Sequence, residues 1–175
     1  MTSSLSDRAS FEAFYSEHRG SIGRALAVTL RDDHLASEAL DEAMVRAYQR
    51  WSEIRRLESP SGWVYTVGLN WSRSVLRRAS RSQSLGVDDR SPGSNQFADP
   101  DVDKALRALT VDQRAVVVCR YLIGYSEAET ARVLSIRPGT VKSRLHRALN
   151  QLHSLLADRN DHPISRTTTA GDEHE

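Results

Sequence analysis

The sequence predicts an all-α protein made of two small helical domains joined by a flexible linker. Three stretches in the first 80 residues carry apolar side chains at helical spacing, and no stretch shows the alternating pattern of a strand. Positions 80–103 are rich in Ser, Asp, Gly and Pro, and they are too long for an ordinary loop inside one compact domain. We therefore expect domains at 8–79 and 104–157, an acidic linker at 80–103 and a disordered tail at 158–175.

The composition is ordinary for a protein that folds in water. The 175 residues are 39% hydrophobic and 27% charged, with a net charge of +1, which argues against global disorder. The N-terminus lacks the apolar core of a signal peptide, and no apolar run approaches the roughly 20 residues that cross a bilayer. We therefore expect a cytoplasmic protein without membrane insertion. The single cysteine, Cys119, excludes an internal disulfide framework, and its apolar neighbours favour burial.

Three amphipathic stretches define the first predicted domain. They run from about 8 to 30, from about 34 to 51, and from Pro60, which suits a first helical position, to about 79. The side chains expected to face the core are Phe11, Phe14, Tyr15, Ile22 and Leu26 in the first, Leu40, Ala43, Met44, Ala47, Tyr48 and Trp51 in the second, and Val64, Val67, Trp71 and Val75 in the third.

Local signals mark the helix ends of the second predicted domain. The capping boxes T-x-x-Q at 110–113 and S-x-x-E at 126–129 each predict a helix start, and Gly124 is expected to end the first of these helices. The second ends near position 134, and Pro138 begins a last helix that runs to about 156. Two helices joined by a three-residue turn predict a helix-turn-helix.

The last predicted helix has an apolar and a basic face. The side chains expected to point inward are Val141, Leu145, Ala148, Leu149, Leu152 and Leu156. The opposite face carries Thr140, Ser143, Arg144 and Arg147, flanked by Lys142 and His146. No acidic residue lies between positions 132 and 147. Arginine and lysine pair with guanine edges in the major groove, whereas hydroxyls contact phosphate, so this face favours DNA binding over a merely solvated helix.

The stretch LTVDQRAVVVCRYLIGYSEAETARVLSIRPGTVKSRLHRALNQL resembles the domain of extracytoplasmic-function (group 4) sigma factors that reads the promoter −35 element. GTVKSRLHRA is similar to that family's recognition helix. The resemblance implies −35 contacts at Arg137, Thr140, Lys142, Ser143, Arg144, His146 and Arg147. Arg137 departs from the family, which usually has Ser or a similar cap there. Loss of a helix cap lowers stability by about 1 kcal/mol, and Pro138 partly offsets this loss. Alternatively, Arg137 contacts a DNA phosphate.

The first half resembles the domain of the same family that binds core RNA polymerase and the −10 element. FEAFYSEHR is similar to its opening helix, and PSGWVYTVGLNWSRSVLRR, with the frame P-x-x-W-x-x-x-x-x-x-N, is similar to its promoter-melting helix. The resemblance implies −10 contacts in the loop 52–59 and at Arg55, Arg56, Asn70, Arg73, Arg77 and Arg78. Four aromatic side chains interleave with these cations: Trp51, Trp63, Tyr65 and Trp71. Such side chains can stack unpaired bases. Most of the four, Trp71 above all, are nevertheless expected in the core.

The second predicted helix matches the family least well. The family pattern A-x-D-L-V-Q-E corresponds to ASEALDE at 36–42, in which Glu42 matches, Glu38 replaces Asp and Asp41 replaces Gln. The resemblance implies that Glu38, Asp41 and Glu42 bind the polymerase, with an affinity that these changes can alter. The alternative is an acidic turn that complements the helix dipole.

The predicted linker is acidic, with Asp88, Asp89, Asp99, Asp101 and Asp103 against Arg81 and Arg90. Such a strand can occupy a channel built for nucleic acid by mimicking its charge, as family resemblance suggests, or it can serve solubility. These two interpretations are equally favoured.

Sigma-factor function implies core RNA polymerase and promoter DNA as partners, an anti-sigma factor as a further candidate partner, and neither a cofactor nor chemistry of its own. The alternative is a stand-alone helix-turn-helix regulator of the LuxR type, but a phosphorylated receiver as its sensing domain would need alternating strands and helices, which the first half lacks. An enzyme is disfavoured because the six histidines show no H-E-x-x-H spacing and no phosphate loop is present. His146 and His153 can share a helix face without a nearby carboxylate, so no metal site is expected.

Overall fold

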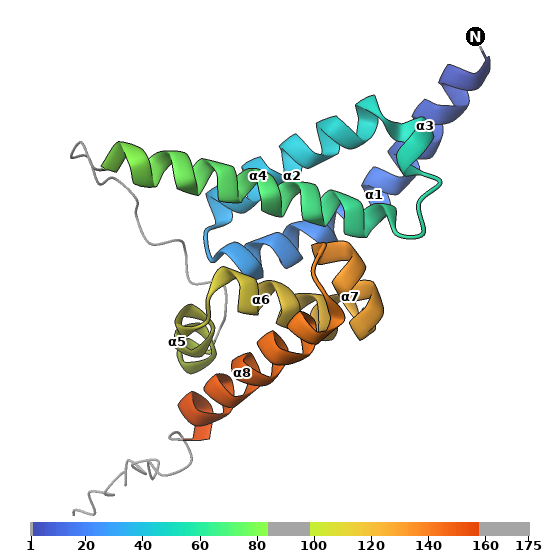
Figure 1. Ribbon diagram of the computed structural model, residues 1–175. Helices are drawn as coiled ribbons and strands as arrows, with labels where there is room; N and C mark the ends of the chain where they lie inside the picture. Colours follow the sequence, from blue (N-terminus) through green and yellow to red (C-terminus); the bar gives the residue numbers. More distant parts are fainter. Residues whose placement is uncertain (1, 84–98, 158–175) are drawn as a thin grey trace, which may run out of the picture.

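The computed structural model describes residues 2–83 and 99–157, and all the regular elements in these ranges are helices (Figure 1). They are α1 (Thr2–Leu30), α2 (Asp33–Gln49), α3 (Trp51–Ile54), α4 (Pro60–Gln83), α5 (Pro100–Ala108), α6 (Val111–Val117), the π-helix η1 (Val118–Ile123), α7 (Glu127–Leu134) and α8 (Pro138–Ala157). The predicted all-α class is confirmed. None of the described helices is long and apolar enough to cross a membrane. The tail predicted at 158–175 lies outside the described residues.

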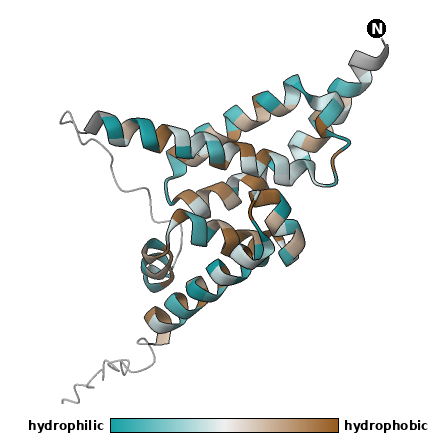
Figure 2. Ribbon diagram, in the orientation of Figure 1, coloured by the Kyte–Doolittle hydropathy of each residue, from teal (hydrophilic) through white to brown (hydrophobic). Residues whose placement is uncertain are grey.

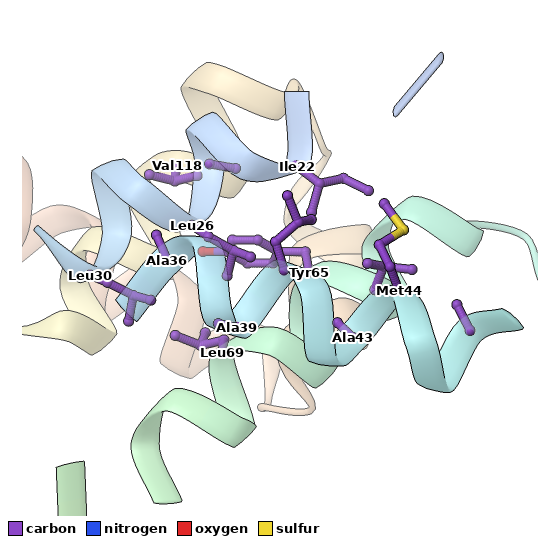
Figure 3. Close-up of a cluster of buried hydrophobic side chains, with 14 of the residues drawn as sticks. Ile22, Leu26, Leu30, Ala36, Ala39, Ala43, Met44, Tyr65, Leu69 and Val118 are labelled. Carbon is purple, nitrogen blue, oxygen red and sulfur yellow. The ribbon is translucent and has the colours of Figure 1, made fainter. Parts of the chain in front are cut away.

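Helices α1, α2 and α4 pack around one core in the first half of the chain (Figures 1 and 3). Leu26 and Val64 are wholly buried, as their helical spacing predicts. Tyr65 lies in the middle of this core, where its hydroxyl forms a 2.8 Å hydrogen bond with Thr29 Oγ1. Tyr15 and Tyr48 were expected to face the core but are exposed, because both lie at the edge of the bundle, where their rings pack against Phe11.

Helices α5 to α8 form the second half, and the predicted helix starts and stops are confirmed there. The backbone N–H of Gln113 donates to Thr110 Oγ1 and the backbone N–H of Glu129 donates to Ser126 Oγ, each at 3.2 Å, so both capping boxes are formed. Gly124, with φ of 88°, ends η1 in the left-handed conformation that glycine adopts without strain.

Two small clusters hold α8 in place. Ala148 packs on Leu106 and Leu109, and Val141 packs on Val116 and Ala131. The buried stripe on α8 is therefore narrow. Leu149, which was expected inside, is 37% exposed because it lies one residue, or about 100° around the helix, beyond Ala148.

The segment formed by α6 and η1 lies between α8 and the N-terminal bundle (Figure 1). Ala115, Val118 and Cys119 join the bundle's core, and Figure 3 shows Val118 beside α1. The predicted burial of Cys119 is confirmed, and this burial raises the pKa of its thiol to about 12. Arg114 is also buried; its Nε donates to the carbonyl oxygen of Thr29 at 2.7 Å. Burial, followed by the charges of nearby arginines, lowers the pKa of Arg114 to about 10.

The range expected to be a linker is helical at both of its described ends. Helix α4 continues to Gln83, and α5 begins at Pro100 after Asp99, whose carboxylate accepts the N–H of Asp101 at 3.0 Å. Asp103 is buried rather than free in solvent, and it forms ion pairs with Arg31 of the first half and Arg107 of α5. Asp, Pro and Asp suit a loop and a helix start equally well, which explains the difference. Asp88, Asp89 and Arg90 lie outside the described residues.

Candidate nucleic-acid interface

Helices α7 and α8 form the predicted helix-turn-helix. Ser135 ends α7 with φ of 54°, and the N–H of Ile136 donates back to the carbonyl of Ala131 at 3.0 Å. The carbonyl of Arg137 accepts the N–H groups of Thr140 and Val141, so α8 begins directly after Arg137. The backbone thus closes this turn, and the buried Val141 anchors α8 against the rest of the half.

The side chains predicted to read the −35 element lie on the outward face of α8 and in the turn before it. Arg137, Lys142, Ser143, His146 and Arg147 are exposed, and Thr140 is half-buried. A shallow hollow of about 480 Å³ runs along this face; it is lined by Gly139, Lys142, Ser143, Leu145, His146 and Leu149. Leu149, which was predicted to face inward, is therefore part of this outer surface.

Arg144 differs from its neighbours because it is bound within the chain. Its Nη2 lies 2.8 Å from Asp112 Oδ2 in the first turn of α6, and its side chain is 26% exposed. The other oxygen, Asp112 Oδ1, accepts Nη2 of Arg73 on α4 at 2.5 Å. One carboxylate therefore holds a residue predicted to contact the −35 element and another predicted to contact the −10 element. No pattern along the chain indicates this contact, because the three residues lie on three separate helices.

The residues predicted to contact the −10 element form two groups. Asn70, Arg73 and Arg77 follow one another along α4, and Asn70 Oδ1 accepts Nη1 of Arg73 at 3.3 Å. Arg77 and Arg78 are exposed on the part of α4 that Figure 2 shows as strongly hydrophilic.

The second −10 group lies in the turn between α3 and α4. Arg56 is exposed there, and Arg55 lies 3.3 Å from Asp7 of α1. The prediction that most aromatic side chains near these cations belong to the core is confirmed. Trp51 and Tyr65 are buried, whereas Trp63 and Trp71 are half-buried against the core.

The acidic residues predicted to bind the polymerase share one helix, α2. Glu38 and Asp41 are exposed, and Glu42 is half-buried. Arg46 pairs with Glu42 at 2.8 Å, and His34 lies 3.6 Å from Glu38. The acidic surface is therefore present, but Arg46 on the same helix partly neutralises it.

Residues 101–152 match the family described as Sigma-70, region 4. The chain is 34% identical over 154 residues to the ECF RNA polymerase sigma factor SigM of Mycobacterium tuberculosis, covering 86% of this chain and 79% of that protein. It is 31% identical to SigL of the same species, covering 87% of this chain and 92% of SigL. It is 30% identical to the RNA polymerase sigma-E factor of Streptomyces avermitilis, covering 85% and 86%.

Solved structures share the fold. The sigma factor RpoE of Bartonella quintana, in complex with the anti-sigma factor NepR, matches with a TM-score of 0.74 and 21% identity over 85% of this chain and 97% of that one. CnrH, in complex with the cytosolic domain of CnrY, matches with a TM-score of 0.62 and 21% identity over 90% and 94%. No comparison supports the LuxR-type alternative. The chain, like the relatives it matches along most of their length, belongs to the extracytoplasmic-function family of RNA polymerase sigma factors.

Proposed function

We propose that this chain binds core RNA polymerase and directs it to promoters by reading a −35 element with α8 and a −10 element with α4. The observation that carries the proposal is the outward face of α8, where basic and hydroxyl side chains are exposed on the second helix of a helix-turn-helix. Its −35 contacts would be Arg137, Thr140, Lys142, Ser143, Arg144, His146 and Arg147.

The first half would supply the remaining contacts. The −10 residues would be Arg55, Arg56, Asn70, Arg73, Arg77 and Arg78, and the polymerase would bind the α2 face made of Glu38, Asp41 and Glu42. We divide the chain into functional units at 8–79 and 104–157. The chain would work beside the polymerase in the cytoplasm without catalytic residues of its own. Strand opening would draw on binding energy, through capture of unstacked −10 bases. An anti-sigma factor binds the solved RpoE of Bartonella quintana, which makes such a protein a candidate partner here as well.

Run-off transcription tests the proposal directly. Purified bacterial core enzyme, the full chain and a genomic promoter pool should give discrete transcripts that core enzyme alone does not produce. The chain should also co-elute with core enzyme in size exclusion at equal stoichiometry. Co-elution without promoter-dependent transcripts would reject promoter reading, and failure to co-elute would reject the role altogether.

Arg147 is the clean position for testing the −35 face, because its guanidinium is exposed and pairs with no carboxylate in the described residues. Arg147→Ala should weaken binding to a cognate −35 duplex by about 1–3 kcal/mol if the arginine makes a bidentate contact with guanine. Ser154→Ala, which changes an exposed residue farther along α8, is the matched control. Equal affinities of the two variants, measured by fluorescence anisotropy at fixed salt, would remove Arg147 from the interface.

A further inference from the structure

Asp112 joins the two halves of the chain at their proposed DNA contacts. Its two carboxylate oxygens each take one guanidinium, from Arg73 on α4 at 2.5 Å and from Arg144 on α8 at 2.8 Å. All three side chains keep partial contact with water, with 42%, 34% and 26% exposure for Asp112, Arg73 and Arg144. Partly exposed ion pairs of this kind are weak and sensitive to salt, so a polyanion can displace the carboxylate.

This arrangement is incompatible with simultaneous contact of both promoter elements. Positions −10 and −35 are about 25 base pairs apart, which corresponds to roughly 85 Å of B-form duplex at 3.4 Å per base pair. Two arginines held by one carboxylate cannot reach two sites separated by that distance. The proposed function therefore requires a state in which α4 and α8 have moved apart and at least one of the two ion pairs is broken.

A second contact supports the closed arrangement independently of charge. Helix α7 packs directly on the start of α4, where Thr66 Oγ1 donates to the carbonyl of Val133 at 2.6 Å. Gly62 allows this approach, because a Cβ at that position would lie 2.7 Å from Ser59 Oγ before α4, 2.8 Å from Val133 Cγ2 and 3.0 Å from the hydroxyl of Tyr125. The hydroxyl of Tyr125 also shares a 2.7 Å hydrogen bond with Ser59 at the start of α4. Close packing and charge pairing thus hold the same two halves together.

We propose that Asp112 is a latch that keeps the free chain closed and masks Arg73 and Arg144 until DNA phosphates or bases replace the carboxylate. The inference rests on the proposed function, since it assigns these two arginines to promoter contacts. Closure lowers the apparent affinity for DNA by the fraction of molecules that are open. Asp112 would therefore regulate binding without touching DNA itself.

The single cysteine provides a natural readout of closure. Cys119 belongs to η1 in the second half, but its side chain is wholly buried in the core of the first half. Burial raises the pKa of the thiol to about 12, so it reacts slowly with thiol reagents while the halves are together. Separation of the halves exposes it. The rate of its reaction with a disulfide reagent, measured at neutral pH on the full chain, therefore reports opening without DNA or polymerase.

Two variants loosen closure by different routes. Asp112→Asn keeps the shape of the side chain but removes the charge that binds both arginines. Gly62→Ala adds a methyl group that would crowd Val133 of α7 as well as Ser59 before α4, while alanine favours the helical conformation of α4. Glu127→Gln is the matched control, because it also removes one exposed carboxylate from the first turn of a helix, here α7. It measures how much DNA binding tightens simply because the protein carries one negative charge fewer. Thermal unfolding of each variant separates opening from loss of folding.

We expect Asp112→Asn and Gly62→Ala to accelerate modification of Cys119 and to tighten binding to a −35 duplex, each by roughly five-fold or more. Glu127→Gln should leave both measurements near those of the unmodified chain. If Asp112→Asn reacts and binds like Glu127→Gln, the latch is overturned, whatever the chain does with promoters. If the two variants accelerate the cysteine reaction but no form binds promoter DNA, closure by Asp112 stands and the proposed function fails.

Discussion

The two halves of this sigma factor are packed very differently. The first half has a continuous core in which α1, α2 and α4 bury large side chains such as Leu26, Tyr65 and Leu69. The second half has two small clusters, and it contributes Val118 and Cys119 to the core of the first. The half proposed to read the −35 element therefore depends on its neighbour for part of its burial. Separation of the halves therefore exposes Val118 and Cys119 and costs part of this burial.

Leu26→Ala should have the largest effect on stability. Leu26 is wholly buried at the centre of the larger core, so truncation should lower the free energy of unfolding by about 2–5 kcal/mol. Because the core also contains Val118 and Cys119, hydrogen exchange should accelerate in η1 as well as in α2 and α4. An effect confined to α1, α2 and α4 would show that the second half does not depend on the first.

Val141→Ala is the counterpart in the second half. Val141 is also wholly buried, but it packs in a small cluster with Val116 and Ala131. We expect a loss of about 2 kcal/mol, with faster exchange limited to α6, α7 and α8. Equal acceleration in α2 would contradict the separation of the cores.

A pair of glycine substitutions should have effects of opposite sign in the two halves. Gly124 has φ of 88°, and Gly20 lies in α1; a Cβ at either position meets no atom within 4 Å. Gly124→Ala should therefore destabilise by about 1–2 kcal/mol through backbone strain alone. Gly20→Ala should stabilise by about 0.5–1 kcal/mol through helix propensity. Chemical denaturation measures both changes, and a neutral Gly124→Ala would mean that the turn can relax.

The smallest expected effect is a pH dependence at the start of α7. Hydrogen bonds from Ser126 lower the pKa of Glu129 below its ordinary value of 4.5. The folded state therefore gains stability above the pKa of the unfolded state, and this gain is lost as the pH falls through the folded pKa. Glu129→Gln can keep the capping hydrogen bond without titrating. The stability difference between the two proteins should change only below about pH 5, and a constant difference down to pH 3 would contradict the assigned cause.

Local signals were readable from the sequence, whereas contacts between helices were not. The capping residues Thr110 and Ser126 and the stop at Gly124 act within one turn of backbone, so their patterns were sufficient to locate three helix ends. The start of α5 was missed because Asp99 and Pro100 suit loops as well as helix starts. The two ion pairs by which Asp112 connects α6 with α4 and α8 depend on how the helices pack, and no spacing along the chain predicts them.

The hydrogen bond from Arg114 to Thr29 has a consequence for α1. The last carbonyl groups of a helix lack partners within that helix, and at Thr29 this partner comes from a residue 85 positions later. When the halves separate, water must replace Arg114 as the hydrogen-bond donor to the carbonyl of Thr29. The guanidinium of Arg114 then keeps only its acceptors at Leu106 and Leu109. The final turn of α1 should therefore fray more readily in the polymerase-engaged protein than in the free one, making helix order at this terminus a second reporter of which state the chain occupies.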